Sequence, residues 1–148
     1  MSISAKSFFS HDEKEKIKAS IREAEMNTSG EIRLHVENKC PADVLDRAAY
    51  IFGKLSMHKT ERRNGVLFYL SVIDHKFAII GDKGINSTVP EGFWDEIKSA
   101  MLHEFQSEAY TNGICLGMRV TGEALKKYFP YQMDDINELP DDISFGEN

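Results

Sequence analysis

Cysteine and long apolar runs are scarce in this sequence, and their scarcity narrows the classes of protein that it can represent. The two cysteines, Cys40 and Cys115, lie far apart and match no metal-ligand spacing. They allow one disulfide, but reduced thiols in a cytosolic chain fit them better. No apolar run approaches the roughly 20 residues of a membrane span, and the N-terminus lacks the apolar segment of a signal peptide. We therefore expect a soluble, cytoplasmic protein with no membrane span.

Basic charge is also in short supply. The chain of 148 residues carries 18 Lys and Arg against 24 Asp and Glu, which gives a net charge of −6. Six of the acids and none of the bases follow Pro130, so the body of the chain is formally neutral. No nucleic-acid partner is expected, because such a partner requires a basic footprint. The composition predicts one domain over residues 1–130 and an acidic, disordered tail over residues 131–148.

Apolar residues recur at helical spacing in four segments. A capping box of Ser10 with Glu13 marks the start of the first helix, and Thr88 with Glu91 marks the third. Pro130 ends the last helix. The four predicted helices span residues 11–27, 41–57, 89–105 and 112–129.

Three further segments have the patterns of strands. Residues 31–37 alternate between apolar and polar side chains, as in a strand with one buried face. Residues 66–73 are almost continuously apolar, as in a central strand covered on both faces. Asp74 and His75 make a short polar break before a third strand at residues 76–80, which predicts an antiparallel hairpin.

The order of these elements predicts an α/β fold. A strand-helix-strand crossover is normally right-handed and joins parallel strands. We therefore expect a three-layer αβα sandwich around a small mixed sheet of about four strands. Residues 85–89 are the candidate for a fourth strand.

This topology brings three loops to one edge of the sheet. They hold residues 29–31, 63–65 and 81–84, while Asp74 and His75 fall at the opposite edge. Glu31, Asn64 and Asp82 supply side-chain oxygens there. The accompanying glycines, Gly84 among them, let the backbone approach closely and expose its carbonyls.

Convergent oxygens of this kind suit a hard divalent cation. Calcium takes about 6–8 oxygen ligands and fits better than magnesium, which demands stricter octahedral geometry. The predicted metal ligands are Glu31, Asn64, Asp82 and Gly84. The alternative is that Asn64 and Asp82 are ordinary turn residues and that Glu31 is an exposed strand end.

Two other groups of polar residues are candidates for function. His35 and Glu37 share a strand face with Arg33 and could be acid/base partners, although a solvated or helix-covered face explains them as well. Residues 58–63 form a basic loop in which Arg63 could hold a phosphate or another anion. A soluble connector is the competing interpretation of that loop.

Three stretches of the chain resemble the TPM domain, a family named from a thylakoid lumen protein, a photosystem II repair protein and a modulator of acetylcholine receptors. They read TSGEIRLHVE, RRNGVLFYLSVIDHKFAIIGDKGI and FWDEIKSAMLHEFQSEAYTNGICLGMRVTGEAL. The resemblance covers about residues 28–125. Where the family has Gly-x-Gly after the third strand, this chain has Gly-Asp-Lys-Gly at residues 81–84.

The resemblance implies an αβα sandwich with an apical site built from loops. It also implies calcium binding, as in some members, and the weak acid phosphatase activity of the plant branch. Carried over by position, Glu31, Asn64 and Asp82 fall at that apex. The family tends to have a signal peptide and a membrane anchor, which this chain lacks, so it resembles a stand-alone, soluble, bacterial-type member.

Three functions follow from these observations. The first is a regulatory or assembly module that binds a divalent cation at the apex. The second is a metal-dependent acid phosphatase in which the cation holds phosphate and polarises a water molecule. The third is a protein-interaction domain without metal, whose acidic tail or polar first-strand face contacts a partner.

Overall fold

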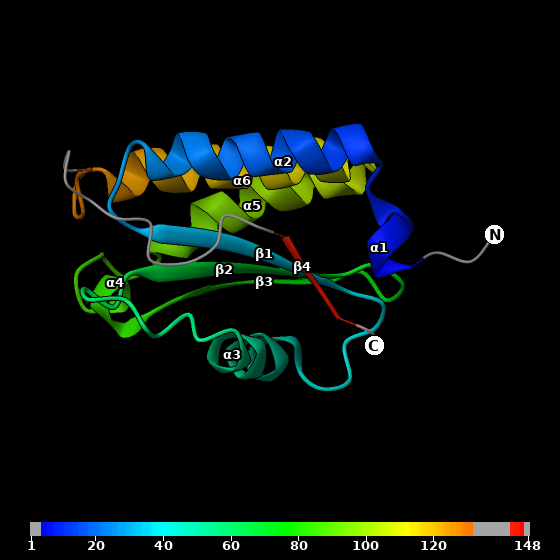
Figure 1. Cartoon of the computed structure of the whole chain (residues 1–148), viewed down its shortest axis with the longest axis horizontal. Coiled ribbons are helices and arrows are strands. Elements are labelled where there is room, and N and C mark those ends of the chain that lie inside the picture. Colours follow the sequence, from blue (N-terminus) through cyan, green and yellow to red (C-terminus); the bar gives the residue numbers. More distant parts are fainter. Residues whose placement is uncertain (1–3, 132–142, 147–148) are drawn as a thin grey trace.

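A mixed four-stranded sheet lies between helical layers in the computed structural model, which describes residues 4–131 and 143–146 (Figure 1). The helices are α1 (Ala5–Phe8), α2 (His11–Glu25), α3 (Val44–Lys54), α4 (Lys83–Asn86), α5 (Phe93–Gln106) and α6 (Tyr110–Leu125). The strands are β1 (Glu31–Glu37), β2 (Gly65–Ser71), β3 (Lys76–Gly81) and β4 (Ile143–Phe145). Among the described residues, no helix has the length and apolar character needed to cross a membrane.

The strand order confirms the predicted crossover. The sheet runs β3-β2-β1-β4, with β1 parallel to β2 and β2 antiparallel to β3. The predicted α/β fold with a mixed sheet is therefore correct. β4 adds a short parallel strand to the outer edge of β1.

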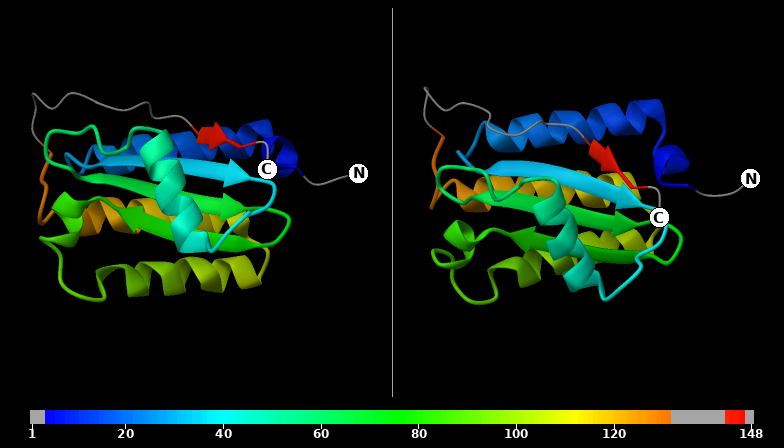
Figure 2. Two further views of the ribbon diagram at one scale, coloured as in Figure 1. Left: turned by 90° about the horizontal axis from the view of Figure 1, so that it is seen from below. Right: turned by 60° about the horizontal axis from the view of Figure 1, so that its bottom comes forward.

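Helices cover both faces of the sheet. α2, α5 and α6 lie on one face and α3 crosses the other (Figures 1 and 2). Because side chains alternate along a strand, Val66, Phe68 and Leu70 of β2 enter the larger core beneath α2, α5 and α6. Leu67 and Tyr69 enter a smaller core beneath α3. This explains why the second strand is apolar without interruption.

Glycines in α6 allow unusually close contact between helices. A Cβ atom on Gly117 would lie 2.2 Å from the Met101 sulfur of α5. A Cβ atom on Gly122 would lie 2.8 Å from the Cα of Ala24 in α2. The three helices over this face are thus fitted to one another as well as to the sheet.

The prediction of a fourth strand at residues 85–89 is wrong. Residues 85–86 belong to the short helix α4, whose first turn is capped by the Asp82 side chain accepting from the Lys83 amide, and residues 87–89 form a turn and a bend. The fourth strand is β4 instead, and it lies within the tail that the sequence predicted to be disordered. The rest of that prediction, at 132–142 and 147–148, lies outside the described residues.

Two helix starts also differ from the prediction. α3 begins at Val44 after the N-cap Asp43, whose carboxylate accepts from two backbone amides, and not at residue 41. α5 begins at Phe93 behind Gly92, which has a φ of 79° and provides no side-chain cap, so the predicted capping box is absent.

Candidate functional site

The three predicted oxygen donors meet at one end of the sheet. Glu31 pairs with Gly65 in the parallel register of β1 and β2. The backbone amide of Asp82 donates to the Gly65 carbonyl at 2.9 Å, and the Glu31 amide donates to the Asn64 carbonyl at 3.2 Å. Backbone hydrogen bonds therefore hold Glu31, Asn64 and Asp82 together, as the topology predicted. We call this group the apical cluster.

The apical cluster is buried, which ordinary turn residues seldom are. Glu31 is 4% exposed, Asn64 2% and Asp82 6%. Polar groups taken out of water need compensating partners, and the Asn64 amide nitrogen lies 3.3 Å from the Ser29 hydroxyl. That contact leaves the amide oxygen of Asn64 as the atom that would serve a cation.

Arg63 closes the apical cluster through a bidentate ion pair with Asp82. Its Nε and Nη2 lie 2.7 and 2.9 Å from the two carboxylate oxygens. The pair raises the pKa of Arg63 through its hydrogen bond with Asp82. The Arg63 side chain is 36% exposed, so its outer side faces solvent. The predicted anion-binding residue and a predicted metal ligand thus neutralise each other.

Gly84 packs the loops of this region together. A Cβ atom at this position would lie 2.1 Å from the Arg62 carbonyl oxygen and 2.5 Å from that of Arg63. Its amide donates to the Arg63 carbonyl at 2.9 Å, and its carbonyl accepts from the Thr88 hydroxyl at 2.8 Å. Only glycine permits this close approach of α4 to the loop before β2.

The apical cluster offers few ligands for a metal ion. Within residues 4–131 and 143–146, no group of three or more His, Cys, Asp and Glu side chains is placed to hold a metal ion. A cation here would use two carboxylates and an amide oxygen, with water molecules completing its shell, as calcium accepts.

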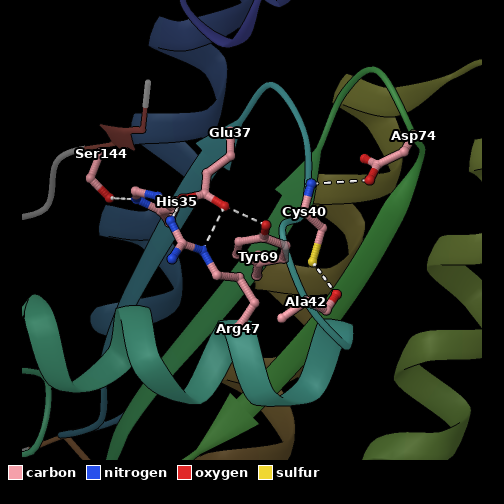
Figure 3. A network of polar contacts seen from close by, with 8 residues as sticks. All are labelled: His35, Glu37, Cys40, Ala42, Arg47, Tyr69, Asp74 and Ser144. Carbon is pink, nitrogen blue, oxygen red and sulfur yellow. Dashed lines mark hydrogen bonds and ion pairs between the residues drawn. The ribbon is translucent and has the colours of Figure 1, made fainter. Parts of the chain in front are cut away.

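A second cluster of polar side chains lies beneath α3, on the opposite face of β1 from α2 (Figure 3). Arg47 of α3 donates from Nε and Nη2 to the Glu37 carboxylate at 3.1 and 2.5 Å. The Tyr69 hydroxyl donates to the same carboxylate. His35 places Nε2 3.3 Å from Glu37 and Nδ1 2.7 Å from the Ser144 hydroxyl. We call these five residues the buried polar network.

Burial sets the protonation states in this network. It lowers the pKa of His35, and the nearby Arg47 and Arg33 add to that effect against the opposing pull of Glu37. Burial would raise the pKa of Glu37, but hydrogen bonds from Arg47 and Tyr69 outweigh it and lower that pKa. At neutral pH a neutral imidazole therefore faces an ionised carboxylate.

The same geometry closes the network to substrates. His35 is 4% exposed, Glu37 1% and Tyr69 0%. The helix-covered interpretation of the first-strand face is the correct one, because α3 lies over His35 and Glu37. The sequence missed Arg47, Tyr69 and Ser144. A tyrosine within a fully buried strand was the available indication, because its hydroxyl needs a partner there.

The comparisons with known proteins agree with this architecture. The TPM domain family matches residues 3–124. The BA42 protein of the psychrophilic bacterium Bizionia argentinensis, solved by NMR, shares 46% sequence identity and a TM-score of 0.89, covering 94% of this chain and 96% of that one. The N-terminal domain of a protein from P. gingivalis shares 17% identity and a TM-score of 0.68, covering 84% and 82%.

The more distant similarity supports the fold alone, whereas the family match spans most of the chain. A comparison with curated proteins finds no match. The matched range includes Glu31, Asn64, Arg63 and Asp82, and therefore the whole apical cluster. The chain belongs to the TPM domain family.

Proposed function

We propose that this TPM domain binds a divalent cation, with calcium favoured over magnesium, at the apical cluster and acts as a regulatory or assembly module. The observation that supports this proposal is the burial of two carboxylates, Glu31 and Asp82, beside the amide of Asn64 at one end of the sheet. Carboxylate and amide oxygens are ligands that calcium accepts, and a calcium ion would add to the partners that Glu31 and Asp82 already have at this end of the sheet.

The guanidinium of Arg63 supplies part of the charge when no cation is bound. It holds both oxygens of Asp82, so calcium must displace it. Arg63 sits at the solvent side of the pair, and its side chain can turn outward without crossing the core. Calcium binding would therefore exchange one positive partner of Asp82 for another and free Arg63.

A calorimetric calcium titration of the full chain tests the proposal. The wild-type chain should bind calcium saturably, and Asp82→Asn, which removes one carboxylate from the apical cluster, should abolish or greatly weaken binding. Asp12→Asn is the matched control. Asp12 is an exposed acid in the first turn of α2 and is not part of the apical cluster. Absence of saturable binding at millimolar calcium, or equal loss in both variants, would contradict the proposal.

A metal-dependent acid phosphatase is the second candidate function, and Arg63 is the residue that favours it. Once released from Asp82, its guanidinium could hold two phosphate oxygens in the geometry that arginine prefers. The test is hydrolysis of p-nitrophenyl phosphate at acidic pH with calcium or magnesium present. Arg63→Lys should lower the rate, because lysine cannot bind phosphate through two parallel hydrogen bonds. Turnover that needs no added cation would count against this mechanism.

A further inference from the structure

The outer edge of β1 carries a short strand from a distant part of the sequence. Residues 34–36 of β1 pair in parallel with β4, Ile143–Phe145. The Gly146 amide extends the contact by donating to the Val36 carbonyl at 2.8 Å. Among the strands that the structure describes, β4 pairs with β1 alone, and β1 would be a sheet edge without it. An edge of this kind is a template for pairing with an extended peptide.

Side-chain contacts make this edge of β1 selective for particular residues in the strand that pairs with it. Ile143 is 5% exposed and belongs to the larger core. On the other face, the Ser144 hydroxyl lies 2.7 Å from Nδ1 of His35. The strand thus presents an aliphatic side chain to the core and a hydroxyl to the buried polar network, where Figure 3 shows Ser144 beside His35.

The next two positions are equally specific. Phe145 is partly buried against the larger core, and the Lys14 ammonium lies 5.0 Å from the centre of its ring. A Cβ atom on Gly146 would lie 2.8 Å from Oε1 of Glu37 and 3.1 Å from Nε2 of His35. The edge therefore accepts an aromatic residue followed by a residue without a side chain.

We propose that the outer edge of β1 is a peptide-docking site, which β4 occupies from within the same chain and from which a partner protein can displace it. The partner presents an extended segment that runs parallel to β1 with the order aliphatic, hydroxyl-bearing, aromatic, glycine. Backbone pairing supplies affinity, while His35, Lys14 and Glu37 read the three positions after the aliphatic one. The cation site at the apex is not needed for this docking.

Because β4 is part of the same chain, a partner must bind the edge of β1 more tightly than a free copy of β4 would. A segment attached to the same chain competes at an effective concentration on the order of millimolar. A three-residue strand forms few backbone hydrogen bonds, and a longer partner strand could also reach the Ile32 amide, which donates to the Glu25 carboxylate at 2.8 Å when β4 is in place. β4 therefore covers the edge of β1 when no partner is present, and a partner with a longer strand can displace it.

A full-chain variant with the edge opened provides the test. Ile143→Asp places a charge in the core position of β4 and should remove it from β1. The probe is a fluorescein-labelled peptide, DDISFGEN, with the sequence of residues 141–148. By fluorescence anisotropy it should bind the variant at least about tenfold tighter than the wild-type chain, since it no longer competes with the tethered strand.

Altered peptides test the specificity. Peptides that carry the Gly146→Val or the Ile143→Asp change should bind the opened variant at least about tenfold more weakly than the parent peptide. Equal binding of all three peptides would overturn the proposal. So would absence of binding to an Ile143→Asp chain that keeps the circular dichroism and thermal unfolding of a folded protein.

A measurement on the wild-type chain keeps the proposal testable if the variant fails to fold. Excess unlabelled DDISFGEN, at several times the roughly millimolar effective concentration of the tethered strand, should shift the amide resonances of residues 143–146 of the ¹⁵N-labelled chain as β4 is displaced, and leave α5 unchanged. Unmoved resonances at that peptide concentration would overturn the proposal. A concentration-dependent dimer of the wild-type chain, lost in Ile143→Asp, would overturn it too, because the occupant would then be a second copy.

Discussion

The chain uses the same chemical pair, an arginine and a carboxylate, at two places with different results. At the apex Arg63 holds Asp82, and beneath α3 Arg47 holds Glu37. Both pairs are bidentate. The Arg63 side chain is 36% exposed, whereas that of Arg47 is 14% exposed and its partner Glu37 is 1% exposed. The pairs thus differ mainly in access to water.

We infer from this difference that the Arg63–Asp82 pair belongs to a binding site and that the Arg47–Glu37 pair stabilises the fold. Under the proposed function, Arg63 turns outward and a cation takes its place beside Asp82, so the apical pair would exchange partners. Glu37 accepts from Arg47 and Tyr69 in a closed space, and removing Arg47 would leave the buried charge of Glu37 uncompensated. An ion pair is therefore evidence of a site only where one of its members can leave.

The largest expected effect comes from breaking the buried pair. Glu37→Gln should lower the free energy of unfolding by about 3–5 kcal/mol, because it leaves Arg47 without its counter-charge in a desolvated place. Urea unfolding of the full chain measures the loss. Asp82→Asn is the matched change at the apex and should cost clearly less, since Asn still caps α4. Equal losses would remove the distinction between the two pairs.

Gly84→Ala should produce the next largest effect. The added methyl group would meet the Arg62 and Arg63 carbonyl oxygens, and such overpacking typically costs about 1–3 kcal/mol. It should also weaken calcium binding, because the loop that carries Asn64 must shift.

Gly53→Ala is the control for this substitution. Its Cβ atom would have no neighbour within 4 Å, and alanine in the last turn of α3 should raise stability by up to about 1 kcal/mol. Loss of stability in Gly53→Ala as large as in Gly84→Ala would show that contact with the carbonyls is not the cause.

Patterning explains why the main elements and the apical cluster could be predicted. Strands with clear alternation or continuous burial have one favourable arrangement, and the crossover rule then fixes which ends meet. Glu31, Asn64 and Asp82 followed from that rule alone. Their neighbour Arg63 was predicted as a separate anion site, because spacing along a chain does not reveal which side chains pair in a loop.

The missed features lack a local pattern. β4 is three residues long and follows an acidic stretch, so neither periodicity nor composition distinguishes it from a tail. Arg47 belongs to an amphipathic helix in which a charged residue normally faces water. Its role depends on Glu37 and Tyr69 from two different strands, and only the assembled sheet brings these three together.

A pH titration should sharpen the comparison further, with a smaller effect. The pKa of His35 is lowered in the folded protein, largely by burial. As the pH falls, His35 therefore becomes protonated in the unfolded chain before it does in the folded chain. Stability should be full above the unfolded pKa of about 6.5 and decline as the pH falls below it. The urea midpoint between pH 7.5 and 5 measures this. The lowered pKa of Glu37 adds a further loss only below its unfolded value of 4.5.

His35→Gln is the control for the titration. A glutamine can keep a hydrogen bond with Ser144 and has no proton to gain in this range. The decline between pH 6.5 and 5 should therefore flatten in the variant. A decline of unchanged size would assign it to other groups and leave His35 without a part in the acid response.

Arg63→Gln should have the smallest effect on stability and the most informative effect on binding. The pair is open to solvent on the side of Arg63, where screening makes ion pairs weak, and the glutamine amide can still donate to the buried Asp82 carboxylate. The urea midpoint should therefore fall only slightly, and by less than in Glu37→Gln. Calcium affinity should nevertheless rise several-fold, because the cation would no longer have to displace a guanidinium from Asp82. Arg47→Gln, the same substitution in the buried pair, should reverse the pattern, with a large loss of stability and unchanged calcium affinity in the fraction that stays folded. If Arg63→Gln instead weakened calcium binding, Arg63 would be holding the apical cluster in its binding geometry, and the apical pair would be a structural support like the buried one.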